Sequence, residues 1–125
     1  MKKIILSEKA PSPIGPYSQA VAVNGMVYIS GQIPIDQESG DLVSGSIEEE
    51  THQVMKNLGY ILSSAGLSYT NIIKTSIFVK DLGNFGRINE VYGTYFDEQP
   101  PARETVEVSR LPKDVNIEIS CIAVE

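Results

Sequence analysis

A double proline delivers the chain into a β-branched run at Gln99-Pro100-Pro101-Ala102-Arg103-Glu104-Thr105-Val106-Glu107-Val108. Proline restricts its own backbone and that of the preceding residue to extended or turn geometry, and β-branched side chains favour strands. The segment therefore predicts a rigid corner and then a strand that begins at Arg103. Side chains alternate between the two faces of a strand, so Arg103 and Thr105 share one face and Glu104 and Val106 the other.

Arg103 has two interpretations at this position. Its planar fork of donors matches the two oxygens of a carboxylate, and the Thr105 hydroxyl would lie beside it. It could equally form an exposed ion pair with Glu104 or Glu107, and such pairs contribute only about 0–1 kcal/mol. The segment alone favours the ion pair, so an anchoring role for Arg103 depends on evidence from the rest of the chain.

The composition is typical of one acidic, globular domain that spans residues 1–125. The chain has 125 residues, of which 42% are hydrophobic and 21% charged. No apolar run approaches the ~20 residues that span a bilayer. The apolar run after Met1-Lys2-Lys3 is too short for a signal peptide, so we expect a cytoplasmic protein without a membrane partner. A net charge of −6 with scattered basic residues argues against nucleic-acid binding.

The single cysteine and the single histidine limit the possible chemistry. Cys121 is the only cysteine, which excludes an intramolecular disulfide and a multi-thiolate zinc site. His52 is the only histidine, which argues against a histidine-based metal site and a Ser-His-Asp triad. We therefore expect no metal site, and we place His52 on the exposed side of a helix.

The first half of the chain contains the clearest local signals. Asn24-Gly25 is a strong hairpin signal, which pairs residues 18–23 with 26–30 as antiparallel strands. Ser46, followed by a glutamate three residues later, predicts a helix start. Apolar residues then recur at helical spacing from Ile47 onward, and Gly66 predicts the helix end.

The remaining segments complete a β-β-β-α-β-α-β-β order. Residues 2–6 predict an edge strand, 72–80 and 115–124 predict longer strands, and Asn84 can cap a second helix. The predicted buried stripe of that helix comprises Phe85, Ile88, Tyr92, Tyr95 and Phe96. The short connection between the last two strands predicts that they pair antiparallel.

Alternation along the final strand separates Glu118 from Cys121. Glu118 shares a face with Ile122, whereas Cys121 belongs to the opposite set, which we assign to the core. If Glu118 lies on the same sheet face as Arg103 and Thr105, the Glu118 carboxylate, the Arg103 guanidinium and the Thr105 hydroxyl lie close together.

A mixed sheet with two helices leaves one sheet face uncovered. Its expected residues are largely apolar: Met26, Tyr28, Ile122 and Val124. An exposed apolar face indicates a partner surface, so we expect a homo-oligomer with polar clusters such as Arg103 and Glu118 near a subunit boundary.

Gly31 follows Ser30 at the end of a predicted strand. It could allow a small ligand to approach the backbone, or it could mark only a bend or bulge. The tetrapeptide alone favours the bulge.

Several motifs together resemble the YjgF/RidA family of reactive-intermediate deaminases. The match runs nearly end to end, and the motifs occur in the order and spacing of that family. They are Ile14-Gly15-Pro16-Tyr17-Ser18-Gln19-Ala20, Ser30-Gly31-Gln32-Ile33-Pro34, Asn89-Glu90-Val91-Tyr92, Pro100-Pro101-Ala102-Arg103, Val106-Glu107-Val108, Leu111-Pro112-Lys113 and Ile117-Glu118-Ile119.

The resemblance implies a single RidA-like domain with a chorismate-mutase-like α+β fold, assembled as a homotrimer with clefts between subunits. It also implies hydrolysis of short 2-imino or 2-enamino acids, such as 2-aminoacrylate, to 2-keto acids and ammonia without a cofactor. Arg103 matches the arginine that binds the carboxylate, and Glu118 matches the glutamate that holds or activates water. The other matched cleft positions are Tyr17, Ser30, Gly31, Asn89 and Thr105. Many members carry cysteine where this chain has Thr105, so thiol chemistry is absent there.

Two other functions remain open at this point. The first is a non-catalytic regulatory module that binds small carboxylates, since an anchoring arginine would serve both functions. Glu118 argues for the enzyme, because a pure carboxylate receptor gains nothing from a second negative charge beside its ligand. The second is an endoribonuclease or translation inhibitor, which the acidic composition disfavours. The physiological imine and the pathway that produces it do not follow from the sequence.

Overall fold

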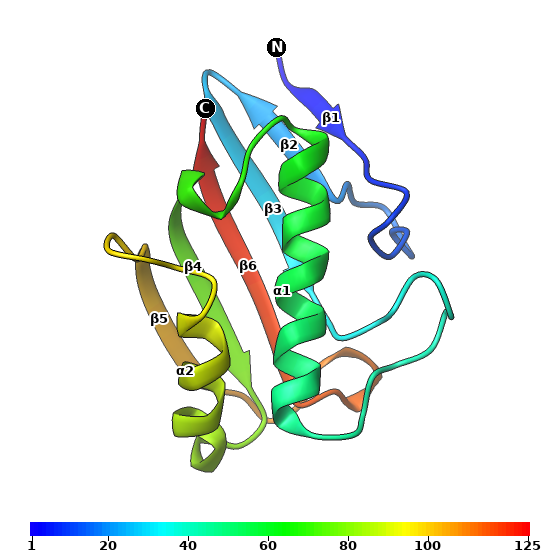
Figure 1. The fold of residues 1–125 in the computed structure, drawn as a ribbon. Helices are drawn as coiled ribbons and strands as arrows, with labels where there is room; N and C mark the ends of the chain where they lie inside the picture. Colours follow the sequence, from blue (N-terminus) through cyan, green and yellow to red (C-terminus); the bar gives the residue numbers. More distant parts are fainter.

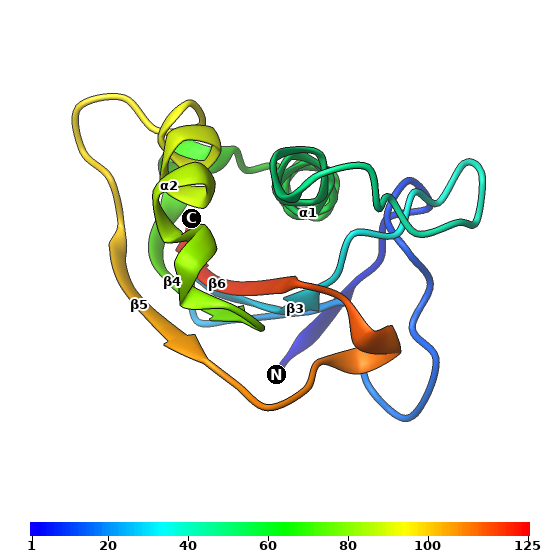
Figure 2. The ribbon, with the colours of Figure 1, turned by 90° about the horizontal axis from the view of Figure 1, so that it is seen from below.

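The computed structural model describes residues 1–125 as a six-stranded mixed sheet with two helices (Figure 1). Figure 2 shows that both helices lie on the same side of the sheet. The predicted element order and the α+β class are confirmed. The elements are β1 (Lys3–Ile5), β2 (Ala20–Val23), β3 (Met26–Gln32), α1 (Ile47–Ser64), β4 (Ile72–Val79), α2 (Phe85–Gly93), β5 (Ala102–Glu107) and β6 (Ile117–Val124).

The strand order is β1-β2-β3-β6-β4-β5, and only the β4–β5 pair is parallel. The predicted pairing of the last two strands is therefore wrong, because β4 lies between β5 and β6. The helix α2 makes the crossover that brings β5 parallel to β4, as parallel neighbours require. The most apolar strand, β6, takes the centre and pairs antiparallel with both β3 and β4, while the mostly exposed β5 forms the edge.

The β2–β3 hairpin forms as predicted. Asn24 and Gly25 both adopt left-handed backbone conformations, with φ of 50° and 78°. Val23 pairs with Met26 across the turn. This geometry is that of the two-residue turn whose twist matches the twist of the flanking strands.

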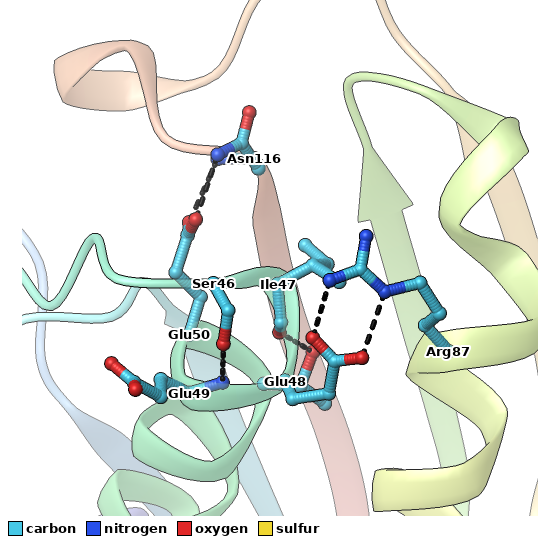
Figure 3. A network of polar contacts seen from close by, with 8 residues as sticks. Ser46, Ile47, Glu48, Glu49, Glu50, Arg87 and Asn116 are labelled. Carbon is cyan, nitrogen blue, oxygen red and sulfur yellow. Dashed lines mark hydrogen bonds and ion pairs between the residues drawn. The ribbon is translucent and has the colours of Figure 1, made fainter.

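The start of α1 is fixed by its own first turn and by two neighbours (Figure 3). The Ser46 Oγ accepts from the Glu49 backbone N–H at 3.1 Å, which confirms the predicted cap. Arg87 of α2 forms a two-pronged ion pair with Glu48, and this pair lowers the pKa of Glu48 to about 2. The buried Glu50 carboxylate accepts from the Asn116 side chain at 2.7 Å. The helix start is thus tied to α2 and to the segment before β6.

The end of α1 also forms as the sequence predicts. Gly66 adopts a φ of 76°, and the Leu67 N–H then donates to the Leu62 carbonyl at 2.8 Å. This bond satisfies a carbonyl that would otherwise lack a partner at the helix end.

The start of α2 differs from the prediction. The Asn84 side chain makes no capping hydrogen bond. Instead, Asp81 accepts from the Gly83 N–H at 2.7 Å and caps a 3₁₀ turn that leads into the helix. Phe85, which we assigned to the buried stripe, is 38% exposed, because it lies at the first helical turn beyond the edge of the core. Ile88 and Tyr92 are buried as predicted.

The core lies between the helices and the sheet. Cys121 belongs to it at 4% exposure, as predicted, and burial raises the pKa of its thiol to about 12. On the opposite face, Tyr28 and Val124 are exposed, which confirms that the sheet has an uncovered apolar face. His52 is exposed and hydrogen-bonds Tyr95. Neither helix has the length and apolar character needed to cross a membrane.

Candidate functional site

Arg103 is held on the helix side of the sheet, at the edge strand β5. Its Nη1 donates to Asn89 Oδ1 at 2.7 Å. The guanidinium carbon lies 5.3 Å from the ring centre of Phe85 and 5.2 Å from that of Tyr92. A cation over aromatic faces is attracted by their negative charge density. The side chain is thus oriented by three residues of α2, and most of its donors remain free.

Neither of the ion pairs considered for Arg103 forms. Glu104 pairs with Lys74 at 3.2 Å and also accepts from Ser76 on the other sheet face, which lowers the pKa of Glu104. Glu107 accepts from the Leu82 N–H at 2.9 Å. Arg103 is therefore a cation without a carboxylate partner in its own chain, as an anchor for a carboxylate would need to be.

Thr105 lies two residues after Arg103 on the same strand face. Its Oγ1 is buried and makes no hydrogen bond, and it is the only buried side-chain polar atom of the chain in that state. Buried polar groups are nearly always paired, so such an atom marks a place where a partner is missing. Arg103, Asn89 and Thr105 form one cluster, which we call the anchor cluster.

Glu118 lies elsewhere, in a pocket of about 480 Å³ that it shares with Tyr17, Ser30 and Gly31. We call this the Glu118 pocket. Burial raises the pKa of the Glu118 carboxyl, and neither a charged partner nor a hydrogen bond offsets that effect. A carboxyl with a raised pKa in a cleft is suited to exchange protons with a bound molecule.

Gly31 lies in a bulge, which is the interpretation that the tetrapeptide alone favoured, and its missing side chain leaves room for Glu118. The β3–β6 register shifts between Ile29 and Gln32, so Gly31 lies in a bulge. A Cβ at position 31 would clash with the Glu118 carboxylate. The glycine thus admits a close approach to the backbone, and the group that approaches is Glu118.

Two buried amides hold the walls of this pocket. Gln19 bonds the loop before β2, and Asn57 of α1 donates to the carbonyls of Ile33 and Ile35 at 3.1 and 3.0 Å. Ser30 contributes through its Oγ, which donates to the Ser18 carbonyl at 2.6 Å. The pocket is therefore shaped by buried hydrogen bonds.

The anchor cluster and the Glu118 pocket do not meet within one chain. On β4, Thr75 pairs with Arg103 and Phe78 pairs with Glu118. Residues directly paired across strands share a sheet face, and Thr75 and Phe78 lie on opposite faces of β4. The sequence left open whether Glu118 shares the sheet face of Arg103 and Thr105, and within one chain it does not. The seven predicted residues form two separate clusters.

Several residues of the site were missed from the sequence. Phe85 and Tyr92 were assigned only to the core, but Phe85 is exposed, and both rings, that of the buried Tyr92 included, lie beside Arg103. Lys113 lines the Glu118 pocket and has a φ of 55°. A left-handed conformation at a residue other than glycine cannot be read from a Pro-Lys pair. Asn57 did carry a signal, since a polar residue at the apolar spacing of a helix usually has a buried partner.

Comparisons with known proteins agree on one family. Residues 7–125 match the family described as Endoribonuclease L-PSP. A RutC family protein of Pyrococcus abyssi is 52% identical over 122 residues, which cover 98% of this chain and 96% of the relative. A Rattus norvegicus protein named 2-iminobutanoate/2-iminopropanoate deaminase is 49% identical and covers 100% of this chain, with 91% of its own length matched.

A solved structure extends the similarity to three dimensions. It is the Rid family protein YyfA of Yersinia pestis, which is 48% identical to this chain. The two superpose with a TM-score of 0.97, and all of both chains is covered.

Proposed function

Because the chain belongs to the endoribonuclease L-PSP family, which is the YjgF/RidA or Rid family, we propose that it is a deaminase of short 2-imino and 2-enamino acids. Its substrates would include 2-aminoacrylate, and its products would be a 2-keto acid and ammonia. The observation that carries the proposal is the pair of clusters: a cation that lacks a carboxylate, and a carboxyl with a raised pKa that lacks a cation.

Arg103 binds the substrate carboxylate in this proposal. The rings of Phe85 and Tyr92 and the Asn89 amide already hold its guanidinium, so little side-chain freedom is lost when the substrate binds. A guanidinium can donate two parallel hydrogen bonds to a carboxylate. The substrate is thereby fixed at one end, and its C=N carbon takes a defined position.

Glu118 activates the attacking water. The water oxygen forms a bond to the imine carbon, the C=N π pair moves to the nitrogen, and Glu118 takes a water proton and passes it to that nitrogen, which gives a carbinolamine. The carbinolamine hydroxyl then loses its proton to Glu118, which delivers it to the amine as the C–N bond breaks, so that ammonia leaves and the carbon keeps the oxygen as the keto group. A 2-enamino acid first takes a proton at carbon and becomes the imine. A well-placed general base commonly contributes about 10²–10⁴-fold.

A complete site requires two copies of the chain. The two clusters lie on opposite faces of one sheet, so Arg103 of one copy would meet Glu118 of a neighbour. The uncovered apolar face, with Tyr28 and Val124 exposed, supports such an assembly. The homotrimer expected from the family would provide three equivalent clefts. A cytoplasmic location remains a prediction from the sequence.

The test is competition for a freshly made imine. An amino-acid oxidase generates short 2-imino acids in the presence of semicarbazide, and the protein diverts the imine before it is trapped. We expect the wild type to lower semicarbazone formation and Arg103→Ala to abolish this effect. Arg87→Ala is the matched control, because Arg87 is also exposed but pairs only with Glu48.

Two results would overturn the proposal in different ways. If the wild type leaves trapping unchanged across several imines, it is not a deaminase of this class. If pyruvate then binds the wild type but not Arg103→Ala, the protein is the carboxylate-binding module instead. Equal diversion by wild type and Arg103→Ala would keep the enzyme but remove Arg103 as its anchor.

A further inference from the structure

Gln19 is the most completely bonded polar side chain beside the Glu118 pocket. It is 1% exposed and directly precedes β2. Its Oε1 accepts from the Ser7 N–H at 2.7 Å. Its Nε2 lies 3.1 Å from the Ser7 carbonyl oxygen, 2.9 Å from that of Pro11 and 3.4 Å from that of Ala10. All of these bonds reach one short stretch of backbone.

That stretch is the base of the loop that forms one wall of the pocket. We call residues 7–17 the N-terminal loop. Ser7 and Ala10 at its base are buried, whereas Ile14 and Tyr17 further along are 76% and 52% exposed. Pro11, Ile14 and Tyr17 line the pocket together with Glu118. The loop is therefore fixed at its base and bears its pocket residues on an otherwise exposed arm.

Few other bonds hold the arm itself. The Tyr17 N–H donates to the Gly15 carbonyl at 2.9 Å, which is a bond within the arm. Ser30 bonds the Ser18 carbonyl just after it. Neither of these two bonds connects residues 7–11 to β2 or β3. The bonds between Gln19 and the base thus set the direction in which the arm leaves the core.

We propose that Gln19 is a positioning residue that keeps the N-terminal loop against the Glu118 pocket and thereby holds Tyr17 in place for the substrate. Gln19 lines the pocket, but its hydrogen bonds go to the loop and none goes to Glu118 or to the anchor cluster. The expected effect of Gln19 on KM rests on the proposed function, whereas its expected effect on the position of the N-terminal loop does not.

The first test replaces Gln19 with methionine, which has similar size and cannot form the bonds. We expect KM to rise about tenfold while kcat stays within about threefold, because the loss concerns a binding wall and not the reacting groups. Tyr69→Phe is the control. It also removes one bond to a buried carbonyl, that of Met55 at 2.7 Å, but Tyr69 does not line the pocket, so KM should not change.

A double-mutant cycle separates positioning from general destabilisation. In a Tyr17→Ala background the Tyr17 ring, which the loop would hold in place for the substrate, is already absent. Gln19→Met should therefore raise KM by less than about twofold in that background. A Gln19→Met effect of equal size in both backgrounds would overturn the proposal, as would a fall in kcat with unchanged KM.

Amide hydrogen exchange provides a readout that needs no activity. Gln19→Met should speed exchange at least about tenfold in the N-terminal loop and leave the β2–β3 hairpin unchanged. Unchanged exchange in the loop would overturn the proposal. If the wild type turns over no imine, the proposed function fails, and this measurement still decides whether Gln19 holds the loop. Should Gln19→Met fail to fold, Gln19→Glu serves in its place, because it keeps the acceptor for Ser7 but loses the donors.

Discussion

Arg103 and Glu118 of the same chain face opposite sides of its sheet. The register through β4 places Arg103 beside the buried Thr75 and Glu118 beside Phe78. A substrate bound to one of these residues therefore lies across the sheet from the other. A reaction that uses both must draw them from two different copies of the chain.

Mixed assemblies should recover activity that neither variant has alone. We expect Arg103→Ala to lose imine hydrolysis and Glu118→Gln to retain only a slow residual rate. When the two are co-expressed and trimers that contain both variants are purified through two different tags, about a third of the sites should contain both native residues. Diversion of imine from semicarbazide measures the recovery. No activity above that of the single variants would place both residues in a site within one chain.

The acid limb of the activity profile should belong to Glu118. Burial raises the pKa of its carboxyl, and a general base works only when ionised. The rate should therefore fall, as pH is lowered, at a higher pH than an exposed glutamate would give. The measurement is kcat/KM against pH for wild type and Glu118→Gln. An identical acid limb in the two proteins would contradict the assignment.

The unfolding free energy should also depend on the ionisation of Glu118. The ionised form supports activity but destabilises the fold. The folded state holds the Glu118 proton more tightly than the unfolded state, so ionised Glu118 destabilises the fold above its raised pKa. Glu118→Gln should then unfold at higher urea concentration than wild type at neutral pH. The difference should shrink as pH falls through the raised pKa and disappear below about pH 4, where both states hold the proton. A variant less stable than wild type at neutral pH would mean that Glu118 has a structural role.

Gly31→Ala should displace Glu118. The new Cβ would clash with the Glu118 side chain, which is flexible and can shift within its pocket, so the cost in unfolding free energy should be small. We expect a loss of imine hydrolysis with little change in urea unfolding. Gly86→Ala is the control, because a Cβ there meets no atom within 4 Å and favours the helix. Full activity in Gly31→Ala would show that the position of Glu118 is not critical.

The Cys121 thiol should be unreactive in the folded protein. It is 4% exposed, and burial raises its pKa to about 12, so almost no thiolate is present at neutral pH. Iodoacetamide should label the protein only after unfolding in urea, as seen by mass spectrometry. Rapid labelling of the native protein would mean that β6 opens readily.

Local chemistry explains which parts of the fold were predictable. Asn24-Gly25, the Ser46 cap and the Gly66 stop each depend on a few adjacent residues, and each forms as expected. The strand order was not predictable in this way. It depends on the α2 crossover, which places β5 beside β4 and leaves the centre to β6.

The candidate site also has a part that was predictable from the sequence and a part that was not. Glu118, Ser30 and Gly31 could be grouped from their motifs, and they do share a pocket with Tyr17. The setting of Arg103 could not be derived, because Phe85 and Tyr92 follow the helical spacing that usually indicates core residues. Whether a ring of that stripe also contacts a cation depends on how α2 lies on the sheet, and the buried Tyr92 does both.

The β4-α2-β5 crossover has a consequence for protein engineering. Arg103, Asn89, Thr105 and the two rings beside the guanidinium all come from β4 to β5, residues 72–107. Every residue that lines the Glu118 pocket lies outside this segment. The crossover is thus a contiguous cassette that could be exchanged between homologues as one piece. Chimeras made at its two ends would combine the anchor cluster of one parent with the Glu118 pocket of another.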